Sequence, residues 1–234
     1  MTPILVLIFS VKPVIAVGTD LLYAAITKSG GILVHNKKGS IEWRIVGLLA
    51  SGSIPSSILA VILLKKLDAG GIDYNNIITT SLSIALILTS ITLLFKDKLH
   101  LIAENERFDS IRTIHRQLQT PITVIAGILL GFLVTFSSVG AGALGAAILF
   151  FLYPRLPSIK IVGTDLAHAI PLTAVAGLGH LHLGTIDLQM LASLLVGSLP
   201  GIYLGSHLAV HLPEKIMRPA LATMLMLIGV RMAI

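Results

Sequence analysis

The chain contains no cysteine, and only 12% of its 234 residues are charged. The lack of cysteine excludes disulfide bonds, metal sites with thiolate ligands and cysteine nucleophiles. The low charge excludes an ordinary soluble domain, because such domains carry about 25% charged residues. The sequence also lacks a phosphate-binding loop of the form GxxxxGK, so ATP-driven transport by this chain alone is not expected.

Hydrophobic residues make up 55% of the chain and form long uncharged runs. Residues 45–64 are one such run, and about 20 helical residues are enough to cross the hydrocarbon core of a membrane. The sequence therefore predicts an all-α, polytopic protein of the cell membrane, with the lipid bilayer as a partner and no nucleic acid. The predicted crossings are residues 14–34, 41–64, 74–94, 160–183, 187–212 and 216–232.

A repeat organises these segments. The stretch "VGTDLLYA" that begins at Val17 returns as "VGTDLAHA" at Val162, and a shift of 145 residues aligns residues 17–60 with 162–205 without a gap. This alignment has 15 identities in 44 positions, where composition alone gives roughly four. Two similar halves are common in secondary transporters, which bind substrates where the repeats meet.

Three crossings in each half is an odd number, so the second half should be inverted relative to the first. We expect residues 1–95 to form the first transmembrane repeat, 96–120 a cytoplasmic basic connector, and 121–234 the second repeat with a hairpin. Basic residues support these sides by the positive-inside rule, with twelve on the connector's side against four on the other. The twelve are Lys37, Lys38, Arg44, Lys96, Lys98, Arg107, Arg112, Arg116, Arg155, Lys160, Lys215 and Arg218, and the four are Lys12, Lys65, Lys66 and Arg231.

The topology gives a direct prediction. A reporter fused near Asn105 should lie in the cytoplasm, and one fused near Gly71 should lie outside the cell. Because the chain has no cysteine, a single cysteine introduced at each position can be labelled with a membrane-impermeant reagent. The labelling shows on which side of the membrane each position lies. Labelling of the two positions from the same side would contradict the inverted arrangement.

Two short apolar legs, residues 121–136 and 141–153, surround the sequence "SSVGAG". At 1.5 Å per residue they span about 24 and 20 Å, less than the roughly 30 Å of a hydrocarbon core. They predict a glycine-rich broken-helix hairpin, either re-entrant or made of two thin crossings. Met1 aligns with Ala146, so the first half lacks the first hairpin leg and the glycine-rich break. Either the coding start lies further upstream, which we favour, or the protein works with one anion-facing break.

The repeat resembles a known family. The segment "AVGTDLLYAAITKSGGILVHNKKGSIEWRIVGLLASGSIPSSILA" and the segment "GILLGFLVTFSSVGAGALGAAILFF" ahead of the second copy are similar to the sulfite exporter TauE/SafE family of membrane permeases. The resemblance spans nearly the whole chain except the connector. It implies a transporter of small sulfur-containing anions such as sulfite or organosulfonates.

Asp20 and Asp165 are the first candidate site residues, because a carboxylate inside the bilayer usually faces a cavity or a partner. They would couple protons or gate the substrate, with Thr19 and Thr164 as hydroxyl ligands. The alternative is structural: Thr or Asp after glycine can cap a helix that restarts at this point.

The glycine-rich break is the second candidate. Ser137 and Ser138 would donate hydroxyls to an anion, while Gly140 and Gly142 would let it approach backbone N–H groups at a helix N-terminus. The alternative is close helix packing through small residues. Lys28 would either attract the anion or extend its ammonium group to the membrane interface.

The sequence thus favours a permease for a small sulfur-containing anion, driven by an ion or substrate gradient, over a membrane-embedded enzyme that uses Asp or His residues. We expect no cofactor, no metal site and no catalytic residue. His180 is expected at the membrane boundary, away from the substrate. The anion, the direction of transport and the formation of a homo-oligomer stay open.

Overall fold

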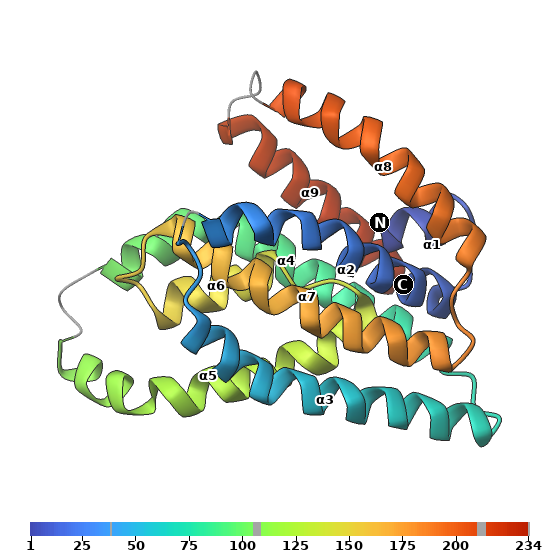
Figure 1. Ribbon diagram of the computed structural model, residues 1–234, viewed down its shortest axis with the longest axis horizontal. Coiled ribbons are helices and arrows are strands. Elements are labelled where there is room, and N and C mark those ends of the chain that lie inside the picture. Colours follow the sequence, from blue (N-terminus) through green and yellow to red (C-terminus); the bar gives the residue numbers. More distant parts are fainter. Residues whose placement is uncertain (38, 105–108, 210–213, 234) are drawn as a thin grey trace.

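The computed structural model describes residues 1–37, 39–104, 109–209 and 214–233, and every regular element in these ranges is an α-helix (Figure 1). The prediction of an all-α protein is confirmed. The helices are α1 (Thr2–Leu7), α2 (Pro13–Lys37), α3 (Trp43–Ala69), α4 (Asn75–Glu104), α5 (Asp109–Ser137), α6 (Ala143–Leu152), α7 (Ser158–His182), α8 (Leu188–Ala209) and α9 (Glu214–Ala233).

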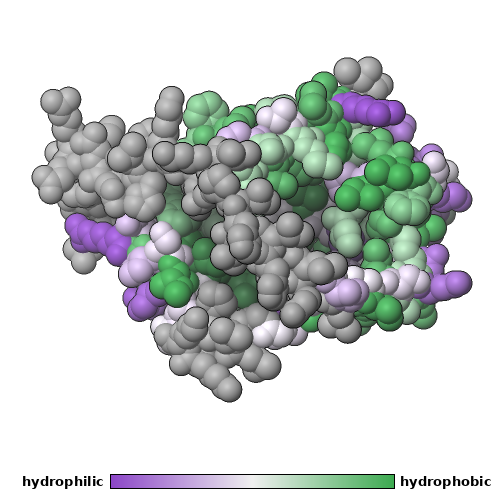
Figure 2. Space-filling model, turned by 90° about the horizontal axis from the view of Figure 1, so that it is seen from above, coloured by the Kyte–Doolittle hydropathy of each residue, from purple (hydrophilic) through white to green (hydrophobic). Residues whose placement is uncertain are grey.

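Four helices are long and apolar enough to cross a membrane, within the part of the chain that the structure describes. Their apolar segments are Trp43–Ala69, Asn75–Phe95, Leu118–Ser137 and Ser158–His182. Large apolar side chains on them are exposed, including Leu59 of α3 and Leu129 of α5. Figure 2 shows hydrophilic side chains mainly toward the two ends of the long axis and apolar ones between them. Exposed apolar side chains between two polar ends suit a protein that lies in a lipid bilayer.

Helices α2 and α7 lie side by side at the centre and run antiparallel (Figure 1). Leu22, early in α2, lies beside Gly177, late in α7. Ile32, late in α2, packs in one cluster with Ala167, early in α7. Helix α3 packs against both α5 and α7, while α4 packs against α9. The antiparallel α2–α7 pair is compatible with an inverted second half, which stays a prediction.

Helices α3 and α5 approach each other through glycines. A Cβ atom added to Gly52 would overlap the carbonyl oxygen of Val124, and one added to Gly127 would overlap that of Leu49. Small residues of this kind let helix backbones touch inside a membrane, where packing and hydrogen bonds replace the hydrophobic effect between helices. These close contacts fix the position of α3 along α5, and α3 carries a residue of the site described below.

The hairpin differs from the prediction in its first leg. Helix α5 continues through Pro121, and its apolar segment Leu118–Ser137 has 20 residues, or about 30 Å. The prediction that this leg is too short to cross the membrane was therefore wrong. An internal proline removes a single backbone hydrogen bond, and the apolar residues on both sides keep this helix continuous. Helix α6 has only 10 residues. Apart from residues 105–108, the segment predicted as connector forms the end of α4 and the start of α5.

Candidate functional site

The break between α5 and α6 is built by left-handed backbone. Ser138 has φ 57°, Gly140 has φ 118° and Gly142 has φ 143°. The Ser137 hydroxyl donates to the Leu133 carbonyl at 2.5 Å and accepts the N–H of Val139 at 3.1 Å. Ser137, predicted as an anion ligand, is therefore engaged in closing the end of α5. Gly142 is the N-cap residue of α6, and among the described residues no side chain makes a capping hydrogen bond to the start of this helix.

Asp20 faces the start of the short helix α1. Its Oδ2 accepts the Thr2 backbone N–H at 3.1 Å and the Thr2 hydroxyl at 2.6 Å. The Ser138 hydroxyl donates to the same oxygen at 3.2 Å, which ties the break to the first half of the chain. The Met1 amino nitrogen lies 3.6 Å away. Since α2 continues through Asp20, the carboxylate caps α1 across the interface instead of a restarted helix of its own.

Asp165 occupies the equivalent place beside α6. It is 4% exposed, and its Oδ1 has no hydrogen-bond partner among the residues that the structure describes. A Cβ atom at Gly145, in the first turn of α6, would overlap this Oδ1. Helix α7 is also continuous through Asp165, so the local capping alternative fails here too. A buried carboxylate oxygen without a partner is costly and indicates a ligand, a proton or a strained state.

Lys28 extends into the break. Its Nζ donates to the carbonyl oxygen of Ala141 at 2.6 Å, across 113 residues of sequence. Its charge also lies close enough to act on both Asp165 and Asp20. The ammonium group therefore points to the break, as the anion-binding interpretation requires, and not to the membrane interface. The structure brings Lys28, Ser138, Gly142 and Asp165 into one region.

The hydroxyls of Thr19 and Thr164 make contacts between the two halves of the chain, and their role as ligands of the anion stays a prediction. The Thr164 hydroxyl accepts the backbone N–H of Glu42 at 3.0 Å, and the Thr19 hydroxyl accepts that of Asp187 at 3.1 Å. Both threonines are fully buried. The two contacts connect equivalent positions of the sequence repeat, each from one half to the other. These hydroxyls hold the starts of α3 and α8 in place.

Thr164→Val should lower the stability of the folded protein by about 1–3 kcal/mol, because it leaves the Glu42 N–H without its acceptor at nearly constant side-chain volume. Thr173→Val is the matched control on the same helix, since the Thr173 hydroxyl donates within that helix, to the carbonyl oxygens of Ala169 at 2.8 Å and Ile170 at 3.2 Å. Thermal unfolding in detergent measures both variants. Equal stability of the two would show that the contact between the halves contributes nothing.

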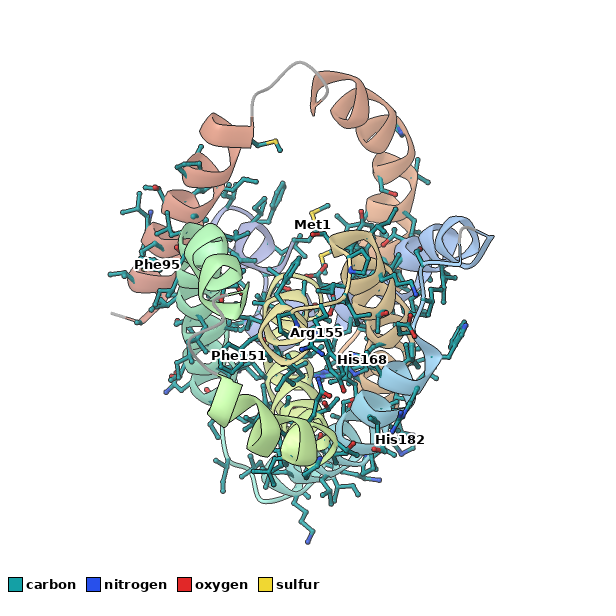
Figure 3. The ribbon with its side chains drawn as sticks, turned by 90° about the vertical axis from the view of Figure 1, so that its left-hand side faces the viewer. Met1, Phe95, Phe151, Arg155, His168 and His182 are labelled. Carbon is teal, nitrogen blue, oxygen red and sulfur yellow. The ribbon has the colours of Figure 1, made fainter. Side chains whose placement is uncertain are left out.

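His168 is a site residue that the sequence analysis did not select. Its Nε2 lies 2.8 Å from the Ser53 hydroxyl of α3, and the residue is 1% exposed. Figure 3 shows His168 inside the helical bundle. The signal was present in the sequence: Asp165 and His168 are three residues apart, which places them on one face of a helix.

His180, expected at the membrane boundary, is fully buried. Its Nδ1 lies 2.9 Å from the Thr185 hydroxyl and its Nε2 3.1 Å from the Thr135 carbonyl oxygen. The imidazole thus fixes the turn after α7 against α5. Its expected separation from the substrate stays a prediction.

A cavity of about 360 Å³ opens where α3 and the apolar part of α5 begin. Its polar lining includes Arg44, Gln119, Thr120 and Tyr153, together with Glu42. Glu42 forms an ion pair with Lys160 at 2.5 Å, so its charge is balanced and Arg44 makes the cavity attractive to an anion.

The sequence model of one family, "Sulfite exporter TauE/SafE", matches residues 1–232. The chain belongs to this family. The "Probable membrane transporter protein YjnA" of Bacillus subtilis (strain 168) is 32% identical over 232 residues, covering 99% of this chain and 89% of the relative. The "Probable membrane transporter protein YdhB" of the same organism is 28% identical over 231 residues, covering 96% and 89%. No solved structure matches the chain.

The match confirms that the chain resembles the TauE/SafE family, as the sequence predicted. Membership in this family makes the protein a multi-pass membrane transporter. The family and its relatives favour transport over the alternative of a membrane-embedded enzyme. The geometry around Lys28 then becomes the candidate substrate site of a transporter. It combines a cation at a helix break with two buried acids on neighbouring helices.

Proposed function

We propose that this TauE/SafE transporter moves a small sulfur-containing anion, such as sulfite or a sulfonate, across the cell membrane, driven by an ion or substrate gradient. The observation that carries the proposal is the ammonium group of Lys28, which is held at the Ala141 carbonyl in the broken hairpin. A lysine inside a membrane protein is expensive and normally serves a function.

The surroundings of Lys28 suit an oxyanion. The first N–H groups of α6 follow Gly142 and carry the partial positive charge of a helix N-terminus. A Cβ atom added to Gly142 would meet no atom of the described residues within 4 Å, so these residues leave room beside this backbone. The Ser138 hydroxyl lies close by and donates to Asp20 at 3.2 Å. A sulfur oxyanion would accept hydrogen bonds from the N–H groups of α6 while its charge lies near the ammonium group, and the Ser138 hydroxyl would join them by turning away from Asp20.

Alternating access would follow from the two halves moving relative to each other. The antiparallel α2–α7 pair and the matched contacts of Thr19 and Thr164 support an inverted repeat whose halves meet at the site. The cavity beside Arg44 lies on the side where basic residues are concentrated, so we assign it as the cytoplasmic opening. Substrate would move between this opening and the break.

Proton coupling would come from the acids. Asp20 and Asp165 would both repel an anion at the break unless one of them is protonated, so lower pH should increase flux. The test is pH-dependent uptake of methanesulfonate into proteoliposomes. A sulfonate stays ionised over the whole range, whereas sulfite itself takes up a proton near neutral pH. The pH dependence then reports on the protein alone.

Asp165→Asn should flatten this pH dependence, because an amide is neutral at every pH. Asp20→Asn and the double variant complete the series, and wild-type uptake of sulfite and of a chloride control tests the substrate class. Unchanged pH dependence in both single variants and in the double would show that neither aspartate couples protons to transport. Equal uptake of chloride and sulfur anions would contradict the proposed substrate.

A further inference from the structure

We infer that His168 and Asp165 form one proton-binding pair, which takes up the proton that accompanies the anion. The inference rests on the proposed function for its link to transport, but the pair itself can be tested without any substrate. It adds a histidine to the proton-coupling groups, for which the sequence suggested only the carboxylates of Asp20 and Asp165.

The first observation is a coincidence of two unpartnered atoms. Oδ1 of Asp165 and Nδ1 of His168 are both buried and have no hydrogen-bond partner among the described residues. The two residues are 4% and 1% exposed, and their spacing on α7 puts their side chains on the same face. In the neutral tautomer that carries its ring hydrogen on Nε2, Nδ1 is an acceptor like the ionised Oδ1. A proton on either atom then supplies the donor that two buried acceptors lack.

The second observation is the Ser53 hydroxyl at 2.8 Å from Nε2 of His168. A serine hydroxyl can donate to a neutral ring nitrogen and can accept from a protonated one. With the ring hydrogen on Nε2, Ser53 accepts it both in neutral His168 and after Nδ1 takes up a proton, so the contact persists in both protonation states. Since Ser53 belongs to α3, a proton bound at His168 acts on the helix that lines the Arg44 cavity as well as on α7.

The third observation is the charge around the pair. Helices α2, α3, α5 and α6 pack against α7. The titratable group that faces the pair from α2 is Lys28, whose charge acts on both members, and Asp20 lies beyond it. Helix α3 contributes the neutral Ser53, while α6 and the apolar part of α5 contain no titratable residue in their sequences.

Charge balance then gives the coupling. With Lys28 positive, Asp165 negative and His168 neutral, this group carries no net charge. One proton from water raises it to +1, which attracts a monovalent anion to the break. When the site opens to the other side, the anion leaves and the proton returns to water there. Each cycle moves one proton with one anion in the same direction.

The substrate-free test is infrared spectroscopy of the purified protein in nanodiscs, titrated from about pH 5 to about pH 8. A protonated Asp165 should give a carboxylic acid band that disappears in Asp165→Asn. In His168→Gln the midpoint of this band should move by about one pH unit or more, because coupled groups titrate together. His182→Gln, at the other end of α7, is the control and should not move it. An unchanged midpoint in His168→Gln would overturn the pair.

The transport test uses methanesulfonate in proteoliposomes with an imposed pH difference. In His168→Gln the glutamine amide can still contact the Ser53 hydroxyl, but it cannot take up the proton. This variant should therefore lose at least tenfold in accumulation driven by the pH difference. Exchange of methanesulfonate at equal pH should continue. Wild-type-like accumulation in His168→Gln would overturn the coupling role. Wild-type protein that moves no sulfur anion would instead contradict the proposed function, and the infrared result would still decide the pair.

Discussion

Lys28→Met should reduce methanesulfonate transport by about 100-fold. The substitution removes the ammonium group from the Ala141 carbonyl and leaves Asp165 as an unbalanced negative charge beside the anion site. An unbalanced charge inside a membrane costs about 2.5–3.5 kcal/mol on insertion scales. At about 1.4 kcal/mol for each factor of ten, this corresponds to roughly two orders of magnitude. Uptake into proteoliposomes, at matched amounts of inserted protein, measures the effect.

Two companion variants separate binding from folding. Lys28→Met combined with Asp165→Asn restores electrical neutrality, so the double variant should recover the stability that the single variant loses. It should still fail to transport, because the cation for the anion is missing. Lys28→Arg keeps the charge and should retain more transport than either. Wild-type rates in Lys28→Met would remove the lysine from the substrate site and with it the main support for the proposed function.

The positions of the helices could be predicted from the sequence because the membrane sets their length. The predicted segment 14–34 is α2 (Pro13–Lys37), and the predicted segment 160–183 is α7 (Ser158–His182). Mainly apolar segments of about 20 residues form helices in lipid, where every backbone group must be paired within the segment. The first hairpin leg was predicted too short because Pro121 was interpreted as a helix start, and a proline inside a helix gives the same local sequence.

The partners of the polar residues could not be predicted in this way. Ser53 and His168 are 115 residues apart, and Thr2 and Asp20 belong to different helices. Hydrophobic patterning shows which residues avoid water but does not show which helix lies opposite. In a membrane protein the pattern is weaker still, because lipid-facing and buried side chains are both apolar. The D-x-x-H spacing at Asp165 was the one local signal, and its meaning depended on Ser53.

Hydroxyl groups were the least predictable part of the site. Thr19, Thr164 and Ser137 were expected to bind the anion, which stays a prediction, and their hydroxyls make contacts with backbone groups. A hydroxyl beside a glycine-rich break is equally suited to a ligand and to an unpaired backbone N–H. Sequence alone cannot separate these uses, since the choice depends on which backbone group the fold brings within about 3 Å.

Gly52→Ala should strongly destabilise the protein, whereas Gly197→Ala should be tolerated. The two glycines occupy the same place in the repeated sequences "GSIP" and "GSLP". A Cβ atom at Gly52 would overlap the Val124 carbonyl oxygen of α5, but one at Gly197 would meet no atom of the described residues within 4 Å. Relief of the overlap requires α3 and α5, which run beside each other (Figure 1), to separate. Overpacking of this kind costs about 1–3 kcal/mol, and backbone atoms can yield less than a side chain.

Separation of α3 from α5 would also move Ser53, the residue after Gly52, away from His168. Gly52→Ala should therefore lower transport in the fraction of protein that remains folded, while Gly197→Ala should keep the wild-type rate. Thermal unfolding in detergent and uptake by reconstituted protein measure the two effects separately. At Gly197, alanine can even add stability, because it favours the helix by about 1 kcal/mol over glycine. Equal stability of the two variants would mean that α3 and α5 do not make this close contact in the membrane.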